Sequence, residues 1–227
     1  MPNVPSLQSG TGAPSSRPAP TPRWRHAICD PSRMASSKAP FGMPRARTVL
    51  LILDMISDFD FPDGEAVLRA ARRIAPRIVA LKARAAKARI PTIYVNDNLG
   101  RWRSDVKALV DRCASDEALG CDVVQQIAPG EEDFVLLKPK HSGFYATPLA
   151  ALLEAAGAKR LILTGLSTQQ CVLFTANDAY LREFELIIPR DCVGAQDSRH
   201  SRLALQYFTS VLSADVRPST RLRLSRR

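Results

Sequence analysis

Three residues with the chemistry of a nucleophilic hydrolase each follow an apolar run of the chain. They are Asp54 after residues 49–53, Lys138 after 134–137 and, across a short polar turn, Cys171 after 161–164. A cysteine attacks as its thiolate, and a carboxylate can take the thiol proton and later give it to a leaving group. An ammonium group stabilises the anion. The set predicts hydrolysis of an amide or ester through a thioester.

The elements that must position these residues alternate along residues 48–216. We expect strands at 48–53, 91–96, 134–137, 160–164 and 185–188, and helices at 65–89, 104–119, 147–156, 170–182 and 198–212. This order predicts an α/β fold: a three-layer, doubly wound, mostly parallel sheet of five or six strands with helices on both faces. In such sheets the ligand crevice lies beyond the carboxyl ends of the strands.

The turn before Cys171 adds to the expected site. Because Cys171 stands where a helix begins, the partial positive charge of the helix N-terminus and the ammonium of Lys138 are expected to lower its thiol pKa. The backbone N–H groups of residues 166–171 are candidates to bind a developing oxyanion.

The net charge of +10 belongs to the ends of the chain. Residues 1–47 hold seven of the 32 basic residues and one acid, and 217–227 hold five and none, which leaves 20 basic and 21 acidic residues in 48–216. We expect a disordered basic Pro/Ser-rich leader at 1–46, one folded domain at 48–216 and a basic Arg-rich tail at 217–227. Nucleic acid is therefore not an expected partner.

Composition excludes several other classes of protein. No apolar run reaches the roughly 18 to 20 residues that cross a bilayer, and the N-terminus has no signal-peptide core. Five cysteines without a CxxC pair and three histidines favour neither a disulfide framework nor a zinc site. We expect a cytoplasmic protein with no membrane partner, no cofactor and no metal.

Three blocks of sequence resemble the isochorismatase-like cysteine hydrolases, the superfamily that includes nicotinamidases and N-carbamoylsarcosine amidases. Residues 54–59 (D-M-I-S-D-F) are similar to the family's D-M-Q-N-D-F, and 138–144 (K-P-K-H-S-G-F) are similar to K-P-R-Y-S-A-F. Residues 165–172 with Thr175, Ala176, Asp178 and Ala179 resemble G-x-x-T-D-x-C-V-x-x-T-A-x-D-A. The likeness covers residues 48–216, and Asp191 stands where the family has a further Asp.

The resemblance implies a catalytic triad of Cys171, Asp54 and Lys138. It also implies a cis peptide bond between Leu166 and Ser167, which aims backbone N–H groups at the oxyanion. The substrate is then a small molecule with a non-peptide C–N bond, and homo-oligomers are expected. Candidate substrate-contact residues are Phe59, Asn98, Trp102 and Phe144.

The departures from the family pattern narrow the function. No histidine lies between His26 and His141, so the metal site of metal-dependent nicotinamidases is absent from the sequence. Isochorismatases proper lack the nucleophilic Cys, which disfavours vinyl-ether hydrolysis here. Two other functions stay open: a catalytically idle interaction module, and a thiol redox sensor in which Cys192 resolves Cys171.

Overall fold

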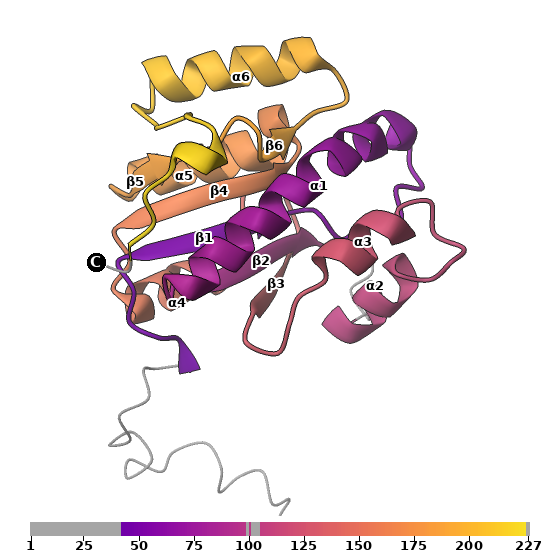
Figure 1. The fold of residues 1–227 in the computed structure, drawn as a ribbon, viewed down its shortest axis with the longest axis horizontal. Coiled ribbons are helices and arrows are strands. Elements are labelled where there is room, and N and C mark those ends of the chain that lie inside the picture. The colour runs from indigo at the N-terminus through magenta and orange to yellow at the C-terminus, as the bar shows by residue number, and fades with distance from the viewer. Residues whose placement is uncertain (1–41, 99, 101–104, 226–227) are drawn as a thin grey trace, which may run out of the picture. The chain divides into compact units, whose positions relative to one another are not determined.

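The fold is a parallel β-sheet between two layers of helices (Figure 1). The computed structural model describes residues 42–98, 100 and 105–225. Its sheet runs in the order β3-β2-β1-β4-β5, with β6 pairing to β4, and every pairing is parallel. The strands are β1 (Thr48–Leu53), β2 (Thr92–Asp97), β3 (Phe134–Lys138), β4 (Arg160–Leu166), β5 (Glu185–Ile187) and β6 (Val193–Gly194).

The helices divide between the two faces of the sheet. The described helices are α1 (Gly64–Lys87), α2 (Val106–Cys113), α3 (Cys121–Ile127), α4 (Leu149–Ala156), α5 (Leu173–Leu181) and α6 (Ser198–Ser210). Buried side chains of α1, α2 and α3 form one apolar core with the sheet, and those of α4, α5 and α6 form the other. The predicted three-layer, doubly wound fold is confirmed.

The strand β1 shows why both faces need cover. Leu50 and Ile52 lie in the core beneath α1, whereas Val49, Leu51 and Leu53 lie in the core beneath α4. Successive side chains of a strand point to opposite faces of its sheet. An all-apolar strand is therefore stable only at the centre of a sheet covered on both sides, which is where β1 lies.

Two elements differ from the expectation. The helix predicted at 104–119 is the shorter α2, followed by turns and by α3, which the sequence pattern did not separate. The two-residue strand β6 was not predicted, and it extends the sheet beside the end of β4. The helix α1 continues through Pro76.

Both ends of the described chain pack beyond residues 48–216. Met43 is fully buried, and the Ala46 N–H donates to the Ala156 carbonyl at 2.9 Å. In the segment that follows α6, the carbonyls of Ser219 and Leu222 accept hydrogen bonds from Arg84 of α1 at 2.7 and 2.6 Å. The packed body therefore includes residues that the sequence assigned to the leader and the tail, while residues 1–41 lie outside the described structure. Within the described residues, no helix is long and apolar enough to cross a membrane.

Candidate active site

The structure brings Asp54, Lys138 and Cys171 together at the carboxyl edge of the sheet. Lys138 Nζ lies 2.9 Å from Asp54 Oδ2 and 3.4 Å from Cys171 Sγ. The Lys138 side chain is fully buried, and Cys171 is 9% exposed. One ammonium group thus contacts both the carboxylate and the thiol.

Lys138 reaches this position across an intervening strand. The sequence suggested three neighbouring strand ends, but β2 separates β3 from β1 in the sheet. Asp97 ends β2 in register with Lys138, and its Oδ2 lies 3.7 Å from Lys138 Nζ. The buried ammonium therefore faces two carboxylates as well as the thiol.

Backbone contacts hold Asp54 in place just after β1. Its φ is +49°, which turns the chain at the strand end, and its Oδ1 accepts from the Asp97 N–H at 2.6 Å. The next turn is held by Asn96, whose side-chain amide exchanges hydrogen bonds with both the N–H and the carbonyl of Ile56 at 3.0 and 2.8 Å. Because Asn96 is buried, these bonds hold the turn that follows Asp54 against the end of β2.

The segment that carries Cys171 begins at a close approach of two backbones. Gly165 has a φ of +108°, and a Cβ there would lie 2.0 Å from the carbonyl oxygen of Leu53, the residue before Asp54. The peptide bond between Leu166 and Ser167 is cis, at the position where the resemblance places one. A π-helical turn, Thr168–Val172, then leads into α5 and carries the thiol.

The thiol pKa differs from the expectation. Burial raises the pKa of Cys171, the nearby Asp54 carboxylate raises it further, and Lys138 only partly offsets these effects. Burial also raises the pKa of Asp54 against the opposing effect of Lys138. For Lys138, burial opposes the charge, but the charges of Asp54, Cys171 and Asp97 together outweigh it and raise the pKa. The expectation of a lowered thiol pKa was wrong because it left out the loss of solvation.

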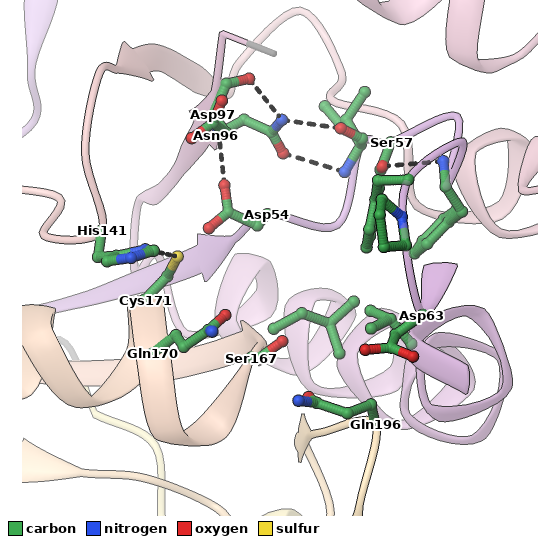
Figure 2. A pocket seen from close by; sticks show the side chains of 16 residues that line it. Asp54, Ser57, Asp63, Asn96, Asp97, His141, Ser167, Gln170, Cys171 and Gln196 are labelled. Carbon is green, nitrogen blue, oxygen red and sulfur yellow. Dashed lines mark hydrogen bonds between the residues drawn. The ribbon is translucent and has the colours of Figure 1, made fainter. Parts of the chain in front are cut away.

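These groups border a cavity of about 420 Å³ (Figure 2). It is lined by Asp54, Ile56, Ser57, Phe59, Phe61, Pro62, Asp63, Val67, Asn96, Asp97, His141, Leu166, Ser167, Gln170, Cys171 and Gln196. In the view of Figure 2, His141, Asp54 and Cys171 lie at one end, and Asp63 and Gln196 lie at the other. A volume of this size suits a small molecule.

The four predicted substrate-contact residues differ in their position relative to the cavity. Phe59 is buried and lines the cavity. Phe144 is not among the lining residues; it packs in the core of the other face, beneath Arg182. Asn98 accepts from the Gly100 N–H at 2.9 Å and holds the turn after β2. Trp102 lies outside the described residues.

Sequence reasoning missed several polar groups at the site, among them Asp97, Asn96 and His141. Asn96 was included only as the last residue of the expected strand 91–96, and the signal for its role was an amide one residue before a strand ends. His141 was noted only as part of the second block, yet its Nδ1 lies 3.6 Å from Cys171 Sγ. Its ring also contacts Phe174 of α5, with 5.3 Å between centroids.

The other described cysteines lie apart from this chemistry. Among the described residues, Cys113, Cys121, Cys171 and Cys192 form no disulfide. Cys192, which the redox-sensor alternative requires as its resolving thiol, is fully buried in the core beneath α1. Burial raises its pKa to about 12. Among the described residues, no group of three or more His, Cys, Asp or Glu is placed to hold a metal ion.

Comparison with known proteins identifies the family. The Isochorismatase domain model matches residues 48–216. The chain belongs to the isochorismatase family. It is 40% identical over 174 residues to the uncharacterized isochorismatase family protein YaaI of Bacillus subtilis, a match that covers 77% of this chain and 95% of that protein. The resemblance drawn from the three sequence blocks is therefore confirmed.

Other known proteins are similar to this chain over shorter stretches of sequence or in fold. Ureidoacrylate amidohydrolase RutB of Methylorubrum extorquens is 44% identical over 69 residues, which are 30% of this chain and 28% of that protein. N-carbamoylsarcosine amidase of Thermoplasma acidophilum superposes with a TM-score of 0.60 at 27% identity, over 78% of this chain and 99% of that one. The nicotinamidase SaPncA of Staphylococcus aureus shares the fold at a TM-score of 0.59 and 22% identity, over 76% and 99%. This chain is an isochorismatase-family hydrolase.

Proposed function

We propose that this hydrolase cleaves a small, non-peptide amide at its C–N bond through a thioester on Cys171. The observation that carries the proposal is the contact of one buried ammonium, Lys138 Nζ, with both the thiol and the Asp54 carboxylate beside the cavity. A nucleophile, a base and a cation within reach of each other make up the machinery of covalent acyl transfer. The amidohydrolase and amidase names of two relatives favour an amide over an ester.

The raised pKa of the Cys171 thiol determines when the thiol loses its proton in the first half-reaction. The resting thiol holds its proton, so Asp54 takes that proton as sulfur attacks the carbonyl carbon. A C–S bond forms, and the carbonyl oxygen gains a negative charge that we expect backbone N–H groups of the Ser167–Cys171 turn to bind. When the tetrahedral species collapses, the proton passes to the leaving nitrogen and the C–N bond breaks.

The second half-reaction releases the acid. Water attacks the thioester carbonyl and gives a proton to Asp54, after which the C–S bond breaks and the proton returns to sulfur. In the resting site Lys138 holds its proton, since the charges of Asp54, Cys171 and Asp97 together raise its pKa despite burial. Its role is to offset whichever negative charge, on oxygen or on sulfur, lies beside it.

The test is acyl-enzyme capture with a panel of small amides. The panel holds neutral, amine-bearing and carboxylate-bearing amides, with ammonia or amine release measured in solution and the intact protein mass measured after acid quench. The substrate that turns over should give a mass increase equal to its acyl group, located on the Cys171 peptide. Cys171→Ala should lose both signals, whereas Cys121→Ala, a matched change at a partly exposed cysteine, should keep them. Turnover that persists in Cys171→Ala would exclude the proposal.

A further inference from the structure

We propose that His141 is a second proton carrier for Cys171, acting from the cavity side of the thiol. The proposal deepens the proposed function, since it concerns the same nucleophile. Its basis is the 3.6 Å separation between His141 Nδ1 and Cys171 Sγ, with both residues lining the cavity (Figure 2). This imidazole is the third polar group that the structure places against the sulfur.

The three groups around the sulfur differ in their access to water. Lys138 is fully buried and the Asp54 side chain is 16% exposed, so both exchange protons with solvent only through the cavity. His141, by contrast, is an exposed residue. An imidazole with one nitrogen on the thiol and its other edge toward water can accept a proton and exchange it with bulk solvent.

The position of His141 is fixed by bonds to the helix that follows the nucleophile. The next residue, Ser142, donates its hydroxyl to the Asp178 carboxylate, and the Gly143 N–H donates to Thr175 Oγ1 at 2.9 Å. Asp178 and Thr175 belong to α5, which directly continues the turn that carries Cys171. The segment that carries the imidazole is therefore hydrogen-bonded to the helix that continues the thiol's own turn, and these bonds hold the two side chains at their separation.

The arrangement answers a need set by the buried ion pair. If Asp54 alone accepts the thiol proton, its ion pair with Lys138 is lost in a buried place, which is costly. A proton on His141 leaves that pair intact: the S–H bond breaks, an N–H bond forms at Nδ1, and the thiolate lies between two cations. The imidazolium then gives the same proton to the leaving nitrogen as the C–N bond breaks.

Three carboxylates border the cavity that His141 also lines. Carboxylates of Asp54, Asp97 and Asp63 line the same cavity, at the ends of β1 and β2 and before α1. Against them stands one buried ammonium, Lys138, already paired with Asp54. The corresponding position in the family block is a tyrosine, whose phenol does not carry a positive charge. The histidine thus gives this chain a proton carrier that the family pattern lacks.

The test measures thiol reactivity without any amide. Wild-type protein, His141→Gln and His141→Tyr are labelled with iodoacetamide from pH 5 to 9, and the rate at Cys171 is followed by peptide mapping. The wild-type profile should show a step between pH 5 and 8, where imidazoles change charge. Both variants should lose that step and react roughly a hundredfold more slowly at pH 7, at the low end of proton-transfer effects. His200→Gln, a change at an exposed histidine of α6, should keep the wild-type profile.

Wild-type profiles in both His141 variants would overturn the proposal, as would an equal change in His200→Gln. The variants should melt with the wild type, because the replaced side chain is exposed. The result is separable from the proposed function. If no acyl group is captured on Cys171 but the pH step in iodoacetamide labelling depends on His141, amide hydrolysis is rejected and the role of His141 stands. If an acyl group is captured but the labelling profile does not depend on His141, only the role of His141 is rejected.

Discussion

Replacing Lys138 by methionine removes the one charge on which the site depends while keeping the length of the side chain. In the native protein its Nζ lies 2.9 Å from Asp54 Oδ2 and 3.7 Å from Asp97 Oδ2, and no part of the side chain reaches solvent. The variant leaves the Asp54 carboxylate without its cation in a poorly solvated place. We expect loss of turnover together with a measurable loss of stability.

The expected loss of stability follows from the burial of the pair. Breaking a buried ion pair by removing one partner costs about 3 to 5 kcal/mol, and the lower value applies here because the Asp54 side chain is 16% exposed and can take up a proton. For a domain of this size, about 3 kcal/mol corresponds to a fall in melting temperature of about 6 to 12 °C.

The pH dependence of that loss identifies its cause. Without the ammonium, the effect of burial on Asp54 is opposed less strongly, so the folded-state pKa of Asp54 rises further above the unfolded value of about 3.9. A carboxyl whose pKa is higher in the folded state binds its proton more tightly there, so stability falls as pH rises above the unfolded value. The deficit of Lys138→Met should therefore be small near pH 4 and full near pH 7.

Urea denaturation followed by circular dichroism at both pH values measures the deficit. The control is a double-mutant cycle: Asp54→Asn/Lys138→Met should lose less stability than the two single changes added together, since the double variant holds no unpaired charge. Equal deficits at pH 4 and pH 7, or strict additivity in the cycle, would refute the argument that an unpaired Asp54 causes the loss.

Four further predictions concern the sheet, the base, the cavity and assembly. Gly165→Ala should destabilise by at least about 2 kcal/mol in thermal melts, because its Cβ meets the Leu53 carbonyl; an unchanged melt contradicts this. In the pH profile of kcat/KM, the midpoint of the acid limb should lie above the ordinary Asp value of about 3.9, because the pKa of Asp54 is raised and protonated Asp54 accepts no proton. A midpoint at or below that value excludes Asp54 as the base. Asp63→Asn should shift preference from amine-bearing toward carboxylate-bearing amides by about two- to fivefold, and an unchanged ratio argues against charge selection there. Sedimentation at micromolar concentration should show a dimer or larger, because α5 and α6 expose several large apolar side chains; monomer alone rejects it.

The sheet and the positions of its reacting groups were predictable because they rest on local patterns. The run Thr48–Leu53 is apolar at every position but its first, and it forms a strand with those bounds. Asp54, Lys138 and Cys171 could be placed at one edge because parallel strands share a direction, whatever their order. The order itself, with β2 between β1 and β3, follows from packing between distant segments and leaves no mark within any one of them.

The features that sequence reasoning missed depend on surroundings. The pKa of the Cys171 thiol depends on how much solvation the thiol loses on burial and on the charges of Lys138 and Asp54, which lie 33 and 117 residues away in the sequence. Phe144 was matched by its place in a block, but the side chain packs beneath Arg182 on the other face. The contact between His141 and the thiol arises from a turn after β3, whose direction the strand pattern does not encode.

The reacting groups and the rest of the cavity wall come from different parts of the architecture. Asp54, Lys138 and Cys171 are fixed by strand register and by Gly165, whereas much of the opposite wall comes from connections, at 56–63 after β1 and at Gln196 after β6. A transplanted connection at either place would reshape the cavity while leaving the nucleophile on the turn that follows β4. Libraries confined to these two connections are therefore the natural route to new substrates, with the sheet edge kept constant as the catalytic platform.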